Sequence, residues 1–279
     1  MKVATLPEIN RDLTDRNRTS PMAFTGNKFE FRAVGSKQTP SFPVALLSTA
    51  VASSVQLLYT ELKASIKGSV ATEQELLTLL RKYIKSTRAV RYEGNGYSDE
   101  WKIEAVKRGL LNIDNCVDAF DQLITAKTIG IFEQQGVLSK EELHSRYHIM
   151  LERYVKDLII EGNCLVNMIK QQVIPSVLQY KKQVADTGNS VKNIGGDAQT
   201  ELELVQLISK HLKPLTVNVG KLEKIVDGIS EEEDQRKAGL ACKKDLLPLM
   251  DLIREDADLL EEIVDDKLWP YPKYIEMLY

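Results

Sequence analysis

Apolar and polar residues alternate only near the start of the chain. The heptapeptide KFEFRAV at residues 28–34 has the period of two that is typical of a half-buried strand. Residues 18–24 form a second strand-like piece, and TGN at 25–27 predicts a tight turn between them, because Gly26 can adopt a positive φ. A lone two-stranded hairpin is marginally stable in water. We therefore expect it either to be covered by the following helices or to belong to a sheet whose other strands lie outside this chain.

From Pro43 onward the spacing of apolar residues is that of helices. The first predicted helix covers residues 43–67. Thr72 and Glu75 have the spacing of a capping box and predict a helix that reaches about Ser86. Residues 91–101 read as a loop, Ser98 is a candidate N-cap for a helix to Arg108, and a further helix is expected over roughly 114–128.

The second half of the chain predicts much longer helices. A second capping box, Ser139 with Glu142, opens a helical run that Pro175 is expected to kink rather than end. Residues 186–198 are rich in Gly, Asn and Asp and are interpreted as a flexible turn. A second long helix should then extend to about Gly228, with Pro214 as another kink.

The last helix is predicted to begin at a third capping box, Ser230 with Glu233, and to turn apolar residues inward and acidic residues outward. Antiparallel helices of this length are typical of a bundle or a projecting helical hairpin. The expected fold class is therefore mostly α, with a short N-terminal β-hairpin followed by a C-terminal domain of long helices.

Composition narrows the classes of partner. The chain has 279 residues, with a formal net charge of only −3, so no overall field favours nucleic acid or a membrane surface. The charge is nevertheless uneven, with a net of +3 over residues 1–40 and −7 over residues 231–279. This pattern favours an anion-facing start and a solvated helical end.

Three cysteines, Cys116, Cys164 and Cys242, are far apart and show no CxxC spacing, which is typical of reduced thiols in a cytosolic protein. The N-terminal residues lack the apolar core of a signal peptide, and no run approaches 18 apolar residues. We expect a cytoplasmic chain without a membrane span.

The charged residues of the opening segment are the strongest candidates for chemistry. On a strand, Lys28, Glu30 and Arg32 project to one face, with about 6.5–7 Å between alternate residues. A carboxylate between two cations stays ionised and can bind a hard divalent metal, while the cations hold phosphate or carboxylate. The alternative interpretation is a solvated strand face with an ordinary pattern of charges.

Two other motifs are weaker. His144 and His148 lie four residues apart on a predicted helix, a spacing that can bind zinc, but the sequence identifies no third ligand. An ordinary helix face is the favoured interpretation of this pair, and a metal-dependent hydrolase is the remote alternative. GNG at 94–96 is too short for a phosphate-binding loop and indicates a structural turn.

Longer strings resemble a known family. DRNRTSPMAFTGNKFEFRAVGS at 15–36 is similar to the late catalytic segment of type III glutamine synthetases. AVRYEGNGYSDEWKIEAVKRGLLN at 89–112, ELHSRYHIMLERYVKDLIIE at 142–161 and WPYPKY at 269–274 also resemble the C-terminal portion of that family, so the likeness covers essentially the whole chain.

The resemblance implies a division of the chain. Residues 1–66 would be the end of the catalytic domain, with the hairpin at the edge of its sheet, residues 67–136 a helical connector, and residues 137–279 the long-helix domain. It also implies a cytoplasmic homo-oligomer, a double hexamer.

The resemblance implies a reaction and roles within it. The family joins ammonia to glutamate with ATP and Mg²⁺ or Mn²⁺, through γ-glutamyl phosphate. Glu30 would be a metal ligand, and Arg32 would bind the carboxylate of the glutamate substrate. Arg18 would be catalytic, touching the transferring phosphoryl group and so ATP, and Lys28, in place of an arginine in other types, would lie near nucleotide phosphate.

Much of the family's active site has no match in this chain. The upstream acidic metal ligands, a metal-binding histidine near a glycine-rich loop and residues of a neighbouring subunit are all missing, which indicates a C-terminal piece of the enzyme. One metal ligand and a few cations do not make a two-metal ATP site, so we expect no glutamine synthesis by this polypeptide alone. The alternative is a non-enzymatic helical assembly or regulatory domain derived from that family.

Overall fold

The structure is a computed structural model of the chain, and it describes residues 22–24, 29–31, 38–66, 70–92, 96, 98–273 and 276–278. The described part is mostly helical, as predicted. Contacts divide the chain into two units. Unit 1 takes residues 1–114 and 125–140, and unit 2 takes residues 115–124 and 141–279. The borders predicted at 66/67 and 136/137 stay predictions.

Two short strands precede the helices. β1 (Met22–Phe24) and β2 (Phe29–Phe31) pair antiparallel, with Ala23 opposite Glu30. The strands predicted over 18–24 and 28–34 were longer, and their remaining residues, together with the predicted turn at 25–27, lie outside the described part of the chain. The hairpin is therefore not confirmed in its predicted extent.

Five helical elements of unit 1 lie among the described residues. They are α1 (Ser41–Ser65), α2 (Glu73–Ser86), the 3₁₀ turn η1 (Arg88–Val90), α3 (Asp99–Lys107) and α5 (Ala126–Gln134). The capping box that opens α2 is confirmed, because the Thr72 hydroxyl accepts from the Glu75 amide and the Glu75 carboxylate accepts from the Thr72 amide. The Ser98 hydroxyl caps α3 by accepting from the Trp101 amide, also as predicted.

Unit 2 contains α4 (Cys116–Asp121) with the 3₁₀ turn η2 (Gln122–Ile124), then α6 (Lys140–Met168), the π turn η3 (Ile169–Val173) and α7 (Ile174–Asn193). After a turn come α8 (Gln199–Glu231), α9 (Gln235–Ala241), the π turn η4 (Cys242–Leu246), α10 (Leu247–Ile263) and the 3₁₀ turn η5 (Glu276–Leu278). The single helix predicted over 114–128 is broken into α4, η2 and α5.

Two predicted boundaries in unit 2 were wrong. The flexible turn expected over 186–198 is helical as far as Asn193, and the chain reverses over 194–198, where Gly195 has a φ of +82°. The capping box expected at Ser230 does not form, because α8 continues to Glu231 and the Ser230 hydroxyl donates to the Val226 carbonyl of the same helix. Asp234 caps α9 instead.

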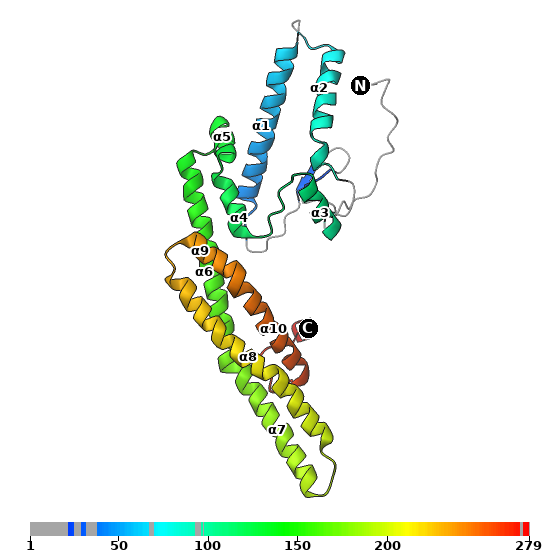
Figure 1. Cartoon of the computed structure of the whole chain (residues 1–279), viewed down its shortest axis with the longest axis vertical. Coiled ribbons are helices and arrows are strands. Elements are labelled where there is room, and N and C mark those ends of the chain that lie inside the picture. The colour runs from blue at the N-terminus through cyan, green and yellow to red at the C-terminus, as the bar shows by residue number, and fades with distance from the viewer. Residues whose placement is uncertain are drawn as a thin grey trace, which may run out of the picture. The chain divides into compact units, whose positions relative to one another are not determined.

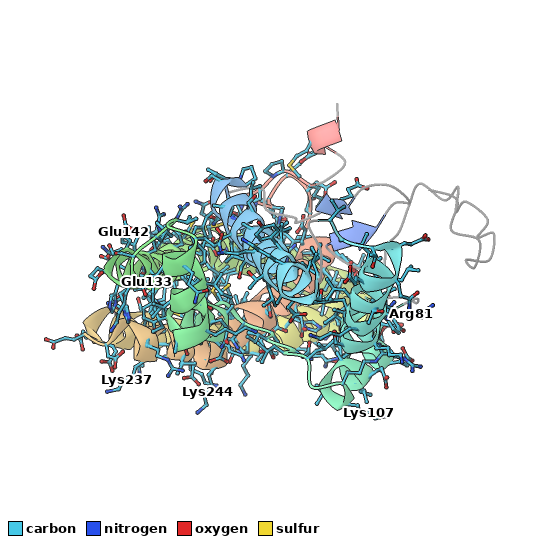
Figure 2. The ribbon with its side chains drawn as sticks, turned by 90° about the horizontal axis from the view of Figure 1, so that it is seen from above. Arg81, Lys107, Glu133, Glu142, Lys237 and Lys244 are labelled. Atoms are coloured by element: carbon cyan, nitrogen blue, oxygen red, sulfur yellow. The ribbon has the colours of Figure 1, made fainter. Side chains whose placement is uncertain are left out.

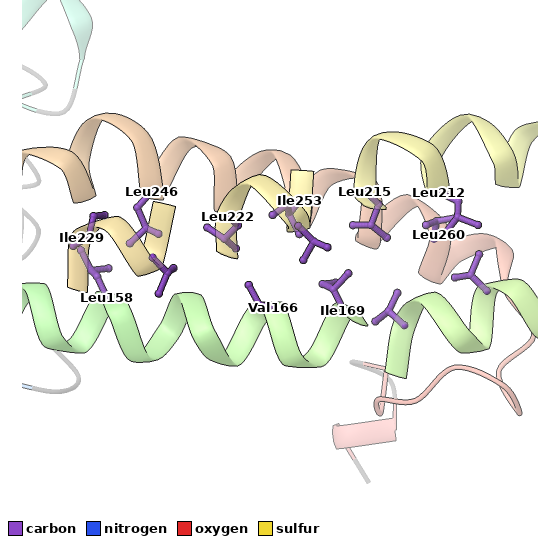
Figure 3. Close-up of a cluster of buried hydrophobic side chains, with 14 of the residues drawn as sticks. Leu158, Val166, Ile169, Leu212, Leu215, Leu222, Ile229, Leu246, Ile253 and Leu260 are labelled. Carbon is purple, nitrogen blue, oxygen red and sulfur yellow. The ribbon is translucent and has the colours of Figure 1, made fainter. Parts of the chain in front are cut away.

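The long helices form one apolar core. α7 and α8 lie side by side and antiparallel, and α10 packs along α8 (Figure 1). Leu158, Val166 and Ile169 line one side of this core, and side chains of α8, η4 and α10 face them (Figure 3). A fully buried leucine or isoleucine contributes about 1.5–3 kcal/mol to folding. The large side chains of this core that are fully buried are Ile208, Leu215, Leu222, Leu246, Ile253, Leu260, Val177, Val219 and Val226.

Pro175 does not end the helical run, as predicted. It stands at the start of α7, directly after the π turn η3, and Pro248 stands in the same way after η4. A proline lacks an amide donor and crowds the carbonyl four residues before it, and a π turn supplies the extra residue that relieves both problems. Pro214 lies inside α8, which continues through it.

One helix of the described residues, α1, is long and apolar enough to cross a membrane. The sequence had led us to expect no membrane span. Length and composition alone are weak evidence, since the core helix of a water-soluble domain passes the same test.

Candidate functional site

Of the four residues predicted to take part in catalysis, the structure describes one. Glu30 is the central residue of β2, is half-buried and stands opposite Ala23 of β1. Arg18, Lys28 and Arg32 lie outside the described residues. The geometry that would relate Glu30 to the three cations therefore stays a prediction.

The described residues do not by themselves form a cluster of metal-binding side chains. No three His, Cys, Asp or Glu side chains gather among them. His144 is half-buried and His148 is exposed, with its ring against the edge of Tyr147 at a centroid distance of 5.2 Å. The helical spacing of this pair is thus accounted for by an ordinary helix face, and the described residues supply no third zinc ligand.

A pocket of about 640 Å³ lies between α1 and α2 in unit 1. Its charged members already have partners. The Glu75 carboxylate accepts from the Thr72 amide in the capping box. Lys82 donates to the Glu61 carboxylate at 2.7 Å. That hydrogen bond lowers the pKa of Glu61 and raises the pKa of Lys82. A paired carboxylate with a lowered pKa is a poor general base at neutral pH, so the pocket has no evident catalytic group.

An aromatic cluster in unit 1 surrounds Arg108. The rings of Tyr92 and Trp101 stack at a centroid distance of 4.0 Å, and the guanidinium lies 5.7 Å and 5.4 Å from their centroids. Arg108 also donates to the Arg91 carbonyl at 2.9 Å and to the Glu104 carboxylate at 2.8 Å. Its donors thus link the Arg91 carbonyl and the Glu104 carboxylate to the aromatic pair.

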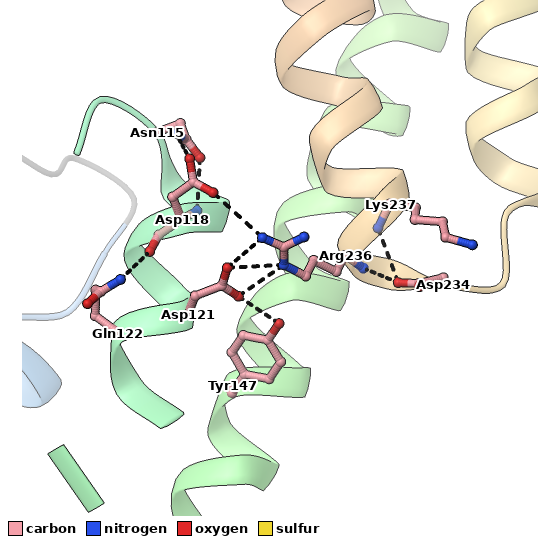
Figure 4. A network of polar contacts seen from close by, with 8 residues as sticks. All are labelled: Asn115, Asp118, Asp121, Gln122, Tyr147, Asp234, Arg236 and Lys237. Carbon is pink, nitrogen blue, oxygen red and sulfur yellow. Dashed lines mark hydrogen bonds and ion pairs between the residues drawn. The ribbon is translucent and has the colours of Figure 1, made fainter. Parts of the chain in front are cut away.

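A polar network in unit 2 centres on Asp121 (Figure 4). The Tyr147 hydroxyl donates to its carboxylate at 2.9 Å, and Arg236 donates from Nε at 3.0 Å and from Nη2 at 2.8 Å. The Arg236 guanidinium holds the pKa of Asp121 below its ordinary value, with the Tyr147 hydroxyl adding to the effect. The network joins α4, α6 and α9.

Two of the three helices that the network joins, α4 and α9, begin at side-chain caps. The Asn115 side chain accepts from the Asp118 amide at the start of α4, and the Asp234 carboxylate accepts from the Arg236 and Lys237 amides at the start of α9. Arg236 is thereby placed at the first turn of α9 with its side chain toward Asp121 (Figure 4). The arrangement is an anchor between helices and needs no ligand.

Two further groups lie inside unit 2. No sequence motif surrounds His211, yet its Nδ1 lies 3.1 Å from the Asp256 carboxylate, and both side chains are mostly buried between α8 and α10. Cys242 is fully buried in the core, and burial raises the pKa of its thiol to about 11, which makes it a poor nucleophile. Cys116 and Cys164 are exposed, and all three thiols are free.

Several further charged side chains lie on the outside of their helices. The six side chains labelled in Figure 2 are all exposed, on α2, α3, α5, α6, α9 and η4. They are Arg81, Lys107, Glu133, Glu142, Lys237 and Lys244. Within the described residues, therefore, the polar clusters stabilise helices. Of the predicted site residues, these ranges contain Glu30 alone, in a three-residue strand.

Comparisons of the chain with known proteins all point to glutamine synthetases. Residues 75–192 match a family model described as the glutamine synthetase C-terminal domain. Over 99% of its length the chain is 36% identical to a type-3 glutamine synthetase of Dictyostelium discoideum and 29% identical to a glutamine synthetase of Bacteroides fragilis. Over 96% of its length it is 32% identical to a glutamine synthetase of Butyrivibrio fibrisolvens. The chain spans only 38–39% of the length of these relatives.

Proposed function

Because the chain belongs to the glutamine synthetase family and carries that family's C-terminal domain, we propose that it acts as the C-terminal part of such an enzyme. The reaction is the ATP-dependent joining of ammonia to glutamate through γ-glutamyl phosphate. One observation carries the proposal: the alignment takes in almost all of this chain but only 38% of the Dictyostelium relative. The larger part of a complete enzyme is thus absent from this sequence.

The opening segment supplies one wall of the active site in this proposal. Glu30 is a metal ligand, Arg32 binds the carboxylate of glutamate, and Arg18 and Lys28 face the phosphates of ATP. Residue chemistry supports these roles, since a carboxylate suits a hard divalent cation and guanidinium groups suit carboxylate and phosphate.

The described residues alone do not fit a resident Mg²⁺ or Mn²⁺, because such ions take about six oxygen ligands. Glu30 is the only described member of the proposed set, and no other acidic side chains gather into a group of three within the described ranges. We therefore derive no catalytic step through ATP or metal in this chain. Its proposed contribution is to complete a site that other residues hold.

A γ-glutamyl hydroxamate assay tests the proposal. The purified chain with ATP, glutamate, hydroxylamine and Mg²⁺ or Mn²⁺ should give no product above a protein-free control. A chimaera in which this chain replaces the matching region of the Dictyostelium enzyme should give product, and Glu30→Gln should abolish it. Turnover by the isolated chain that depends on ATP and metal would contradict the proposal.

A second candidate function rests on unit 2. Its long helices share one continuous core, and its polar clusters anchor helices to one another. These features suit an assembly or regulatory domain as well as an enzyme part. By family likeness we propose a cytoplasmic homo-oligomer, a double hexamer. Light scattering of the chimaera and of the isolated chain would show whether the chain itself holds subunits together.

A further inference from the structure

α1 is an apolar helix that the rest of the described chain leaves mostly uncovered. Residues 41–60 of this helix contain no Asp, Glu, Lys or Arg, and only 6% of its most apolar stretch of 18 residues is buried. Apolar surface left in water is unfavourable, and a contiguous exposed apolar patch marks an interaction site. The helix therefore needs a partner that the described residues do not provide.

The two sides of α1 differ. On one side Thr49 is 3% exposed, and the Gln56 side chain accepts a hydrogen bond from Gln135, which follows α5. About 110° around the helix from that side lies the outer stripe, which we define as Val44, Ser48, Val51, Val55 and Tyr59. Their spacing of four, three, four and four residues keeps them on one line along a helix. The valines are 50–57% exposed, and Tyr59 is 62% exposed.

We propose that the outer stripe of α1 packs against an apolar sheet face in the catalytic part of glutamine synthetase, the part of the relatives that this chain does not span. The inference rests on the proposed function. The relatives supply a large partner, because about three-fifths of their length lies outside the match to this chain. The absence of charge on the stripe suits the interior of a domain.

The neighbouring strands point to a sheet as that partner. β2 ends at Phe31 and α1 begins at Ser41, so the helix follows closely on a strand pair. Within the described residues this pair has only two strands of three residues each, too little to be stable alone. A helix layer packed on a sheet layer is a standard arrangement of a domain core. Among the described residues the sheet has only two short strands, and the outer stripe of α1 is uncovered.

A lipid bilayer fits the helix less well. The middle of α1 carries Ser53, Ser54 and Gln56, and Gln56 is bonded on its inner side to Gln135. A membrane-spanning helix presents apolar groups to lipid on all its free sides, and it avoids such a concentration of amide and hydroxyl groups. Burial of one side against protein and the other against a sheet satisfies both faces.

Cysteine accessibility tests the inference. Val55→Cys lies on the outer stripe, and the matched control Leu57→Cys lies about 200° around the same helix, where Leu57 is 54% exposed. Each variant is made in the isolated chain and in the chimaera with the Dictyostelium enzyme. Maleimide labelling is followed peptide by peptide in a mass spectrometer, so that labelling of Cys116 and Cys164 is counted separately.

We expect labelling at position 55 to be at least tenfold slower in the chimaera than in the isolated chain, with less than a threefold change at position 57. Unchanged labelling at 55, or equal protection at both positions, would overturn the inference. So would protection at 55 when phosphatidylcholine vesicles are added to the isolated chain. Hydroxamate activity of the chimaera reports separately on the proposed function, because an active chimaera with position 55 fully labelled would contradict only the packing of α1.

Discussion

The Asp121 carboxylate receives hydrogen bonds from Tyr147 and Arg236 and so ties three helices together. Because Arg236 lowers the pKa of Asp121 in the folded state, the ionised carboxylate stabilises the fold above its unfolded pKa of about 3.9. That contribution is lost as the pH falls through the lower folded value. Asp121→Asn should therefore reduce the free energy of unfolding by about 1 kcal/mol at pH 7, a modest amount because the pair is partly exposed and screened.

Urea unfolding followed by circular dichroism measures this difference. The gap between wild type and Asp121→Asn should be full at pH 7 and 5 and should shrink as the pH falls to 3. Asp251→Asn, an exposed change on α10, serves as the control and should stay within about 0.5 kcal/mol of wild type. A gap that is the same at every pH would show that the charge of Asp121 contributes nothing.

Two helical glycines should respond in opposite ways to the same substitution. A Cβ at Gly162 would lie 2.8 Å from Cγ2 of Val226 and 3.4 Å from Cδ1 of Leu246, so Gly162→Ala should cost about 1–3 kcal/mol through overpacking. A Cβ at Gly228 would meet nothing within 4 Å, so Gly228→Ala should stabilise α8 by about 0.5–1 kcal/mol. Thermal unfolding compares the two. A higher melting temperature for Gly162→Ala would contradict the packing at Gly162, and a lower one for Gly228→Ala would contradict the open space at Gly228.

At the scale of elements, α2 illustrates a boundary fixed by a local signal. Thr72 and Glu75 exchange both hydrogen bonds of a capping box. Thr72→Ala removes the hydroxyl acceptor and should destabilise the first turn of α2 by about 1 kcal/mol. Hydrogen exchange of the amides at 73–76 should accelerate about fivefold, while Thr78→Ala, whose hydroxyl bonds within the same helix, should leave them near wild type. Equal acceleration in both variants would show that the Thr72 cap does not specifically stabilise the first turn of α2.

Helix boundaries were predictable where the signal lies within one turn of the chain, as at Thr72 and Ser98. They were not predictable where packing decides. Ser230 has the spacing of a cap, but burial of Val226 and Ile229 against the core carries α8 past it. The π turns before Pro175 and Pro248 were not predicted either. The position of the extra residue in a π turn depends on the proline and on core packing, and no residue type in the sequence identifies that position.

At the scale of the whole molecule, the sequence indicated the family through long strings and the helical architecture through periodicity. It could not indicate the contacts that hold unit 2 together. Asp121 and Arg236 are 115 residues apart, and His211 and Asp256 are 45 apart, so neither pair leaves a local pattern. The candidate site could be predicted as residue chemistry at Glu30, while its remaining members are either outside the described residues or outside this chain.

The C-terminal helices are predicted to be necessary for the fold of unit 2. Leu246, Ile253 and Leu260 are fully buried against α8 and its neighbours, so deletion of residues 235–279 would open the core along α8. Each buried side chain lost in this way costs about 2–5 kcal/mol, so three of them together cost about as much as the whole stability of an ordinary domain. The truncated chain should lose its cooperative unfolding transition and should associate into species of mixed mass in light scattering.

A matched pair of point variants separates loss of the core from loss of surface. Ile253→Asp places a charge in the core and should reproduce the effect of the deletion, whereas Leu252→Asp, one residue away and 49% exposed, should unfold like wild type. The contrary outcome is a deletion that leaves the association state and the unfolding transition the same as in the full chain. In that case the packing of α10 on α8 would not contribute to stability. The packing instead predicts that the long hairpin and the last helix fold as one cooperative body, because α8 is buried by both.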